Sequence, residues 1–122
     1  MKALRVLLVE DEALLSMLMA DVLKDMGHDV CAIESSEGRA VAAAARCLPD
    51  LMIVDVHLGE GGSGAAAVAE ILRTGFVPHV FVSGSTLRDY PLSPKAVVLL
   101  KPFVESDLAR AIQRALDTSS AY

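Results

Sequence analysis

The sequence predicts a single α/β domain in which a doubly wound parallel sheet carries helices on both faces. Two observations lead to this prediction. Short apolar segments of strand length alternate with segments of helical periodicity, and this alternation repeats five times along the chain. The chain has 122 residues, 53% of them hydrophobic, so it can bury one sizeable core without disulfides or a structural metal.

Five apolar segments have the length and composition of strands that are buried on both faces. The second of them has the weakest apolar pattern. The predicted strands cover residues 4–9, 28–33, 51–56, 79–82 and 96–100.

The segments between the first three strands predict helices with recognisable ends. Residues 13–26 have an apolar stripe at helical spacing, and Gly27 follows at the position of a C-cap glycine. Ser35 and Ser36 can cap a second helix that extends to Cys47. The stripe of the first helix consists of Leu15, Leu18, Val22 and Met26.

The second half of the chain predicts two more helices and one irregular segment. Residues 65–73 predict a helix, whereas Pro91 and Pro94 forbid a long regular helix around them. We expect the domain to span residues 1–118 and residues 119–122 to form a flexible tail. The apolar stripe of the last helix consists of Leu108, Ile112 and Leu116.

Charge and cysteine content exclude several classes of protein. With 16 acidic and 11 basic residues the net charge is −5, which disfavours binding to nucleic acid. No apolar segment is long enough to span a membrane, and the N-terminal segment lacks the pattern of a signal peptide, so we expect a cytoplasmic protein without membrane contacts. Cys31 and Cys47 lack metal-binding spacing, so we expect two buried thiols.

Charged and hydroxyl residues collect where the predicted strands end. Glu10 and Asp11 follow the first strand, Asp55 ends the third, Ser83 follows the fourth and Lys101 follows the fifth. Each of them alone could be a turn or cap residue. Ligands of parallel α/β sheets bind at the carboxyl ends of the strands, so the ordered series predicts one site at that edge.

This set of residue types indicates metal-assisted phosphoryl chemistry. Neighbouring carboxylates disfavour one another's ionisation, and a divalent cation such as Mg²⁺, which prefers oxygen ligands, offsets that cost. Lys101 would supply a positive charge and Ser83 a hydroxyl donor to a bound phosphoryl group. Asp55 is then placed to act as the nucleophile and to carry the group as an acyl phosphate.

With these residues the sequence resembles the receiver domain of two-component response regulators over essentially the whole chain. The resemblance implies a flavodoxin-like (βα)5 fold with strand order 2-1-3-4-5. It also implies a chain without an output domain, either a stand-alone receiver similar to chemotaxis regulators or a fragment of a longer protein. The motifs that carry the resemblance are Val9-Glu10-Asp11-Glu12, Asp55, Val82-Ser83-Gly84 and Lys101-Pro102-Phe103.

The resemblance implies a role for each site residue. Asp55 would accept a phosphoryl group from a phosphohistidine of a sensor histidine kinase or a histidine phosphotransfer protein. The implied Mg²⁺ ligands are Glu10, Asp11, Asp55 and the backbone carbonyl of His57. The implied phosphate-binding and switch residues are Ser83, Gly84 and Lys101.

The resemblance further implies a signalling protein that catalyses only its own phosphorylation and dephosphorylation. Its conformational switch would control an unnamed downstream protein, with homodimer formation on phosphorylation as one option. Val98 stands where the family commonly has an aromatic residue, so the usual route from phosphate to partner surface does not carry over. The segment around Pro91 and Pro94 also differs from the family's usual pattern, and it lies in the region of the family's main partner-binding surface.

Three other functions compete with this interpretation. A receiver-like module that acts without phosphorylation, and a small Mg²⁺-dependent aspartyl-phosphate hydrolase, would share the pocket chemistry. The hydrolase is disfavoured because His57, rather than an acid, follows Asp55 by two residues. Residues 59–64 match the GxGxxG pattern of dinucleotide-binding proteins, but no acid ends the next strand and Glu60 places a negative charge in the loop.

Overall fold

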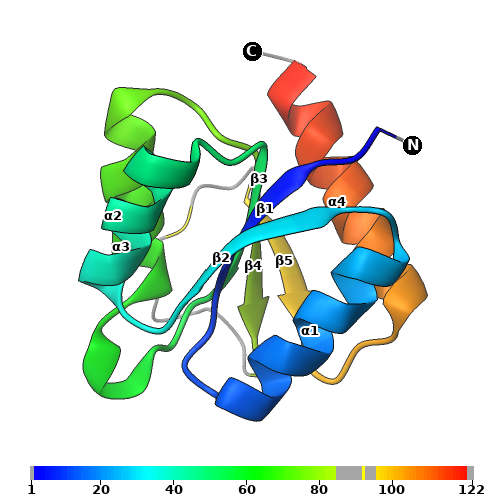
Figure 1. The fold of residues 1–122 in the computed structure, drawn as a ribbon, viewed down its shortest axis with the longest axis horizontal. Coiled ribbons are helices and arrows are strands. Elements are labelled where there is room, and N and C mark those ends of the chain that lie inside the picture. The colour runs from blue at the N-terminus through cyan, green and yellow to red at the C-terminus, as the bar shows by residue number, and fades with distance from the viewer. Residues whose placement is uncertain (1, 85–91, 93–95, 121–122) are drawn as a thin grey trace.

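The computed structural model describes residues 2–84, 92 and 96–120, and these form one five-stranded sheet (Figure 1). The strand order is β2-β1-β3-β4-β5, and every neighbouring pair is parallel. The predicted α/β class and strand order are therefore confirmed. The strands are β1 (Arg5–Val9), β2 (Asp29–Glu34), β3 (Leu51–Asp55), β4 (His79–Ser83) and β5 (Val97–Leu100).

Four α-helices of the described residues cover the sheet, two on each face (Figure 1). On one face lie α1 (Ala13–Asp25) and α4 (Glu105–Ser120), and on the other lie α2 (Glu37–Cys47) and α3 (Gly64–Ile71). Two short 3-10 helices, η1 (Gly59–Gly61) and η2 (Leu72–Thr74), flank α3. The segment around Pro91 and Pro94 lies outside the described residues.

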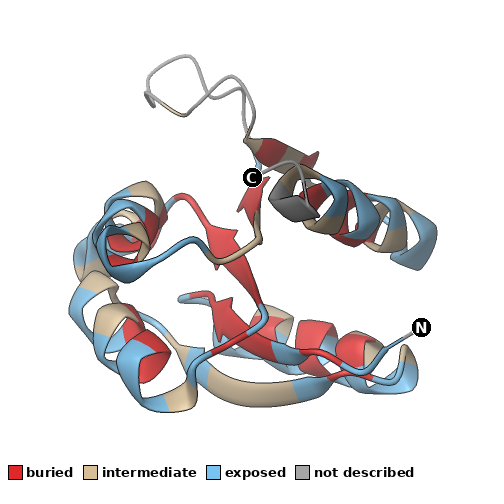
Figure 2. Cartoon of the chain, turned by 90° about the horizontal axis from the view of Figure 1, so that it is seen from above, coloured by how far each residue is buried: buried red, intermediate tan, exposed pale blue. Residues whose placement is uncertain are grey.

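Two apolar cores separate the sheet from its two helical layers (Figure 2). Strand side chains alternate between them, so Val6 and Leu8 pack toward α1 and α4 while Leu7 and Val9 pack toward α2 and α3. Burial of β1 and β3 on both faces explains why their sequences are almost continuously apolar. β1 ends directly before Glu10 and β3 ends at Asp55, so the buried strands hold these two carboxylates at the edge of the core.

The apolar stripe predicted for α1 is not its buried face. Leu18 is 54% exposed, and the predicted stripe lies at the margin of the contact with the sheet. The small side chains of Ser16 and Ala20 face inward instead and allow a close approach, while the Ser16 hydroxyl bonds to the carbonyl oxygen of Ala13 at 2.8 Å. The buried residues of α1 are Ser16, Met19, Ala20 and Leu23.

The last helix, α4, extends to Ser120, two residues into the segment expected to form a tail. Its inner face contains Leu108 and Ile112, both predicted from the apolar stripe and both fully buried. Among the helices of the described residues, none combines the length and apolar composition that crossing a membrane requires.

Candidate functional site

The parallel sheet brings the predicted residues to one edge. Glu10 and Asp11 directly follow β1, while Asp55 and Ser83 are the last residues of β3 and β4. Lys101 directly follows β5. Since all five strands run in the same direction, these positions share the carboxyl edge of the sheet, as the sequence predicted.

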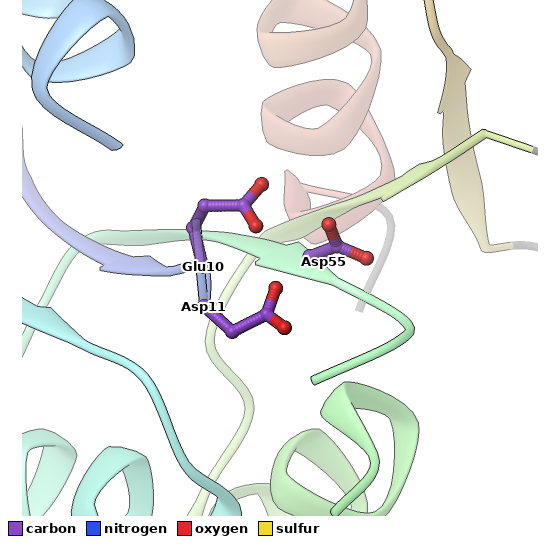
Figure 3. A group of neighbouring side chains, drawn as sticks. All are labelled: Glu10, Asp11 and Asp55. Carbon is purple, nitrogen blue, oxygen red and sulfur yellow. The ribbon is translucent and has the colours of Figure 1, made fainter. Parts of the chain in front are cut away.

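Three carboxylates form the centre of this edge (Figure 3). One oxygen each of Glu10, Asp11 and Asp55 lies within 4.8 Å of the other two. Figure 3 shows the carboxylates of Glu10 and Asp11, at the end of β1, extending toward the side on which Asp55 lies at the end of β3. Glu10 and Asp55 are each only 6% exposed, whereas Asp11 is open to solvent. The arrangement is therefore a partly buried acidic cluster with one side accessible from outside.

Lys101 is the cation of this cluster. Its Nζ lies 2.8 Å from Oδ2 of Asp55 and 3.4 Å from Oε1 of Glu10. Burial alone lowers the pKa of Lys101, but the hydrogen bond and charge of Asp55, with a contribution from Glu10, outweigh burial and raise it. The ammonium group thus stays charged beside two buried carboxylates.

One ammonium does not balance three carboxylates, and Glu10 shows the consequence. Burial is the main cause that raises the pKa of Glu10 to about 7, and the nearby charge of Asp55 raises it further. The backbone N–H of Glu12, which donates to Oε2 of Glu10 at 3.2 Å, acts in the opposite direction. Close to neutral pH an additional positive charge would therefore stabilise the cluster.

The donor set fits a divalent cation with hard oxygen preference. It offers three carboxylates at mutual distances compatible with one ion, and it lacks sulfur and imidazole donors among the grouped atoms. Mg²⁺ is typically held by one or two carboxylates with water and phosphate oxygens in the remaining positions. The exposed side at Asp11 leaves room for such ligands.

The other predicted site residues surround the cluster. The backbone N–H of His57 donates to Oδ1 of Asp55 at 2.9 Å, and the His57 side chain is exposed. Ser83 is 4% exposed at the end of β4, and its carbonyl oxygen accepts the Lys101 N–H at 2.8 Å. Gly84 is exposed beside it. Val98 is half-buried and packs against the core beneath α2 and α3.

The glycine-rich loop after Asp55 packs against its own chain. A Cβ atom on Gly64 would lie 2.0 Å from the carbonyl oxygen of Asp55, and one on Gly61 would lie 2.6 Å from that of Ser35. Gly62 adopts φ of +100°, a conformation that favours glycine. Close packing, rather than a cradle for a pyrophosphate, explains the glycines that match the dinucleotide-binding pattern.

Sequence reasoning missed Glu37 at the start of α2. Its Oε1 accepts the backbone N–H of Ser63 at 3.2 Å, and Ser63 in turn caps α3 by accepting the N–H of Ala66. Glu37 therefore ties α2 to the loop that carries His57. An acid in the first helical turn is common as a partner of the helix dipole, so its type and position alone did not indicate this contact.

Comparison with known proteins identifies relatives over nearly the whole chain. The response regulator receiver domain family matches residues 6–113. The phyllosphere-induced regulator PhyR of Methylorubrum extorquens is 30% identical across 93% of this chain and 44% of its own length. The transcriptional regulatory protein PdtaR of Mycobacterium tuberculosis is 34% identical across 92% of this chain and 56% of its own length. The chain thus spans about half the length of these relatives.

Solved structures agree with the sequence relatives. The receiver domain of Erythrobacter litoralis PhyR is 34% identical and superposes with a TM-score of 0.83, covering 94% of this chain and 91% of that domain. The response regulator PhyR from Brucella abortus is 28% identical with a TM-score of 0.87, covering 98% of this chain and 50% of that protein. The similarity thus covers nearly all of one isolated receiver domain and half of the Brucella abortus protein.

Proposed function

The chain belongs to the response regulator receiver domain family of two-component signalling, and on that premise we propose that Asp55 accepts a phosphoryl group in a Mg²⁺-dependent reaction. The observation that carries the proposal is the position of Lys101 Nζ, 2.8 Å from Oδ2 of Asp55 at the centre of the acidic cluster. An ammonium held against a buried carboxylate supplies the charge that a phosphoryl group on that carboxylate requires.

The proposed transfer starts from a phosphohistidine of a sensor kinase or a phosphotransfer protein. A carboxylate oxygen of Asp55 attacks the phosphorus atom, the P–N bond breaks, and the imidazole leaves with its electron pair and takes up a proton. The product is an acyl phosphate on Asp55. Water later attacks the phosphorus and releases inorganic phosphate, which restores the carboxylate.

The surrounding residues hold the reacting groups. Glu10, Asp11, Asp55 and the backbone carbonyl of His57 would bind the cation, which when bound offsets the negative charge of the phosphoryl oxygens. After phosphorylation, Lys101 would pair with a phosphoryl oxygen instead of the free carboxylate of Asp55. Ser83 would donate its hydroxyl to a second oxygen, and the N–H of Gly84 would line the same position.

We infer that the phosphodonor protein docks on the exposed apolar surface of α1. Leu14 is 71% and Met17 is 63% exposed there, and Leu18 borders a groove of about 410 Å³ beside α1. Lys101 lines both this groove and the acidic cluster, so a partner seated on α1 would lie beside the site that contains Asp55. Exposed apolar patches of this kind mark protein interfaces.

The output side of the protein is proposed in broader terms. The protein acts as a signalling receiver rather than an enzyme on external substrates, and passes its state to a downstream protein. Phosphate binding would draw Ser83 inward and change the packing at the end of β4. Val98 lacks an aromatic ring, so the packing change would pass through the core beneath α2 and α3, which Val98 contacts.

The experiment that tests the proposal is labelling with acetyl phosphate, read by intact mass. We expect one phosphoryl adduct on the wild-type protein with Mg²⁺ and none on Asp55→Asn. The matched control is Asp25→Asn, which removes an exposed acid from the end of α1 and should label like the wild type. A chelator should abolish the adduct both in the wild type and in Asp25→Asn.

Two results would contradict the proposal. An adduct that persists in Asp55→Asn would place the phosphoryl group elsewhere, and folded wild-type protein without any adduct would favour a module that acts without phosphorylation. Repeated release of phosphate from an added organic phosphate ester, with Asp55 required, would instead indicate the hydrolase.

A further inference from the structure

The fold brings the chain's two cysteines together at the edge of the sheet, far apart from each other in sequence. Cys31 lies in β2, the outer strand, and Cys47 is the last residue of α2. The Cys47 thiol donates to the carbonyl oxygen of Cys31 at 3.5 Å, and the Cys31 thiol donates to that of Val6 at 3.4 Å. Both cysteines are free and half-buried rather than buried as predicted.

We propose that Cys31 and Cys47 form a reversible disulfide that joins the end of α2 to β2, with a low-molecular-weight disulfide such as oxidised glutathione as the oxidant. No residue of the acidic cluster takes part, so the proposal is independent of phosphorylation. The two thiols are neighbours in space, they are partly open to solvent, and neither occupies a metal site of the described residues.

The charges around the pair give the two thiols different reactivity. Burial is the main cause that raises the pKa of Cys31 to about 11, and a hydrogen bond with the Cys47 thiol raises it further. The Arg5 guanidinium lowers it in part, and the same group donates to the Cys47 carbonyl oxygen at 2.9 Å and 3.3 Å. Because its raised pKa disfavours the thiolate, Cys31 is assigned the second step of the exchange.

The proposed reaction is a two-step exchange. The Cys47 thiolate attacks one sulfur of oxidised glutathione, forms a mixed disulfide and releases one glutathione thiolate. The Cys31 thiol loses its proton to water, and its thiolate attacks the Cys47 sulfur and releases the second glutathione. The protein loses two electrons and two protons, and the oxidant becomes two molecules of glutathione.

Disulfide formation requires the two sulfur atoms to approach each other. A disulfide needs its sulfur atoms at about 2.05 Å and the Cβ atoms at about 3.8 Å. Folding has already closed the 16-residue separation between the two cysteines, which is the entropic cost that opposes ring closure in an unfolded chain. The folded protein should therefore form the disulfide far more readily than the same chain in urea.

The test is equilibration of the full chain with reduced and oxidised glutathione, followed by acid quenching and intact mass. We expect a monomer that has lost two hydrogen atoms, that carries no glutathione and that dithiothreitol restores. The equilibrium constant for disulfide formation should be at least about tenfold higher in the folded protein than in urea. An equal or lower constant in the folded protein would overturn the proposal.

Single-cysteine variants identify the role of each thiol. Cys31→Ser should stop at a stable mixed disulfide on Cys47, and Cys47→Ser should gain glutathione more slowly on Cys31. Both variants conserve side-chain size, and the urea comparison with wild type holds even if one variant folds poorly. Wild-type protein that accumulates two glutathione groups, or disulfide-linked dimers, would show that the pair does not close.

Discussion

The two edges of the sheet bury polar side chains in opposite ways. At the carboxyl edge, Glu10 and Asp55 are buried beside the ammonium of Lys101, which contacts both carboxylates. At the amino edge, His28 is 5% exposed, and Nδ1 of its ring accepts the N–H of Leu4 at 3.2 Å. Nε2 of His28 is the one buried side-chain nitrogen or oxygen of the described residues without a hydrogen-bond partner.

This difference separates a site from a structural contact. The His28 ring is neutral, so it adds no charge to the core, although its unpartnered Nε2 carries a desolvation cost. Its hydrogen bond to Leu4 helps to hold the start of β2 beside β1. A cluster with excess negative charge is unfavourable in the folded protein, and a purely structural role would be served as well by apolar residues. We infer that the carboxyl edge retains its charges for binding and that its geometry depends on close backbone packing.

The largest expected effect tests that dependence on packing. Gly64→Ala places a methyl group 2.0 Å from the carbonyl oxygen of Asp55 and 2.6 Å from Cγ1 of Val54, so α3 must move away from β3. We expect the free energy of unfolding to fall by about 3 kcal/mol or more. Urea denaturation followed by circular dichroism measures the loss.

The matched control for this substitution is Gly38→Ala in α2. An added Cβ at Gly38 meets nothing within 4 Å, and alanine favours the helical conformation, so stability should rise by about 1 kcal/mol at most. Equal losses at both glycines would refute the claim that the carboxyl edge depends on a close approach at Gly64.

The second effect concerns the ammonium of the cluster. Lys101→Met leaves Glu10 and Asp55 without their cation, and we expect a loss of about 2 kcal/mol at neutral pH. The loss stays below that of a fully buried pair because the Lys101 side chain is 24% exposed and Glu10 can take up a proton. Added Mg²⁺ should recover part of it, measured as a shift in Tm with and without chelator.

A surface ion pair serves as the control for Lys101. Arg73 lies 3.2 Å from Glu70, but both side chains are more than half exposed, so Arg73→Met should change the free energy of unfolding by less than about 0.5 kcal/mol. Neither Mg²⁺ nor chelator should affect this variant differently from the wild type. Similar losses in the two variants would mean that burial does not distinguish the cluster.

Sequence reasoning predicted the residues of the carboxyl edge because the end of each strand can be recognised from its own segment of sequence. Glu10, Asp55 and Lys101 each interrupt an apolar segment, and parallel pairing then brings them together whatever the details of the loops. The strand order, in contrast, was predicted only from the family resemblance, because the alternation of strands and helices does not determine which strands are neighbours.

Contacts between different elements were not accessible in this way. Leu18 fits the apolar period of α1 yet is exposed, because the angle at which the helix meets the sheet selects its neighbours Met19 and Ala20. The contact between Cys31 and Cys47 depends on how α2 returns to the outer strand. These features follow from packing in three dimensions, for which one sequence without the fold gives no signal.

The smallest expected effect concerns the amino edge and its dependence on pH. Burial lowers the pKa of His28 below its ordinary value of 6.5, so the unfolded chain binds the proton more tightly than the folded protein. Stability contributed by the neutral ring is therefore complete above about pH 6.5 and is lost as pH falls below it. One pH unit below that value, the loss is at most about 1.4 kcal/mol.

The variant His28→Asn tests this origin, because an amide oxygen can accept the Leu4 N–H without titrating. We expect its unfolding free energy to fall less than that of the wild type between pH 7 and pH 5.5. His79 also has a pKa lowered by burial, so part of the pH dependence should remain in the variant. An unchanged pH dependence would show that protonation of His28 does not lower the free energy of unfolding, and it would contradict the contrast drawn between the two edges.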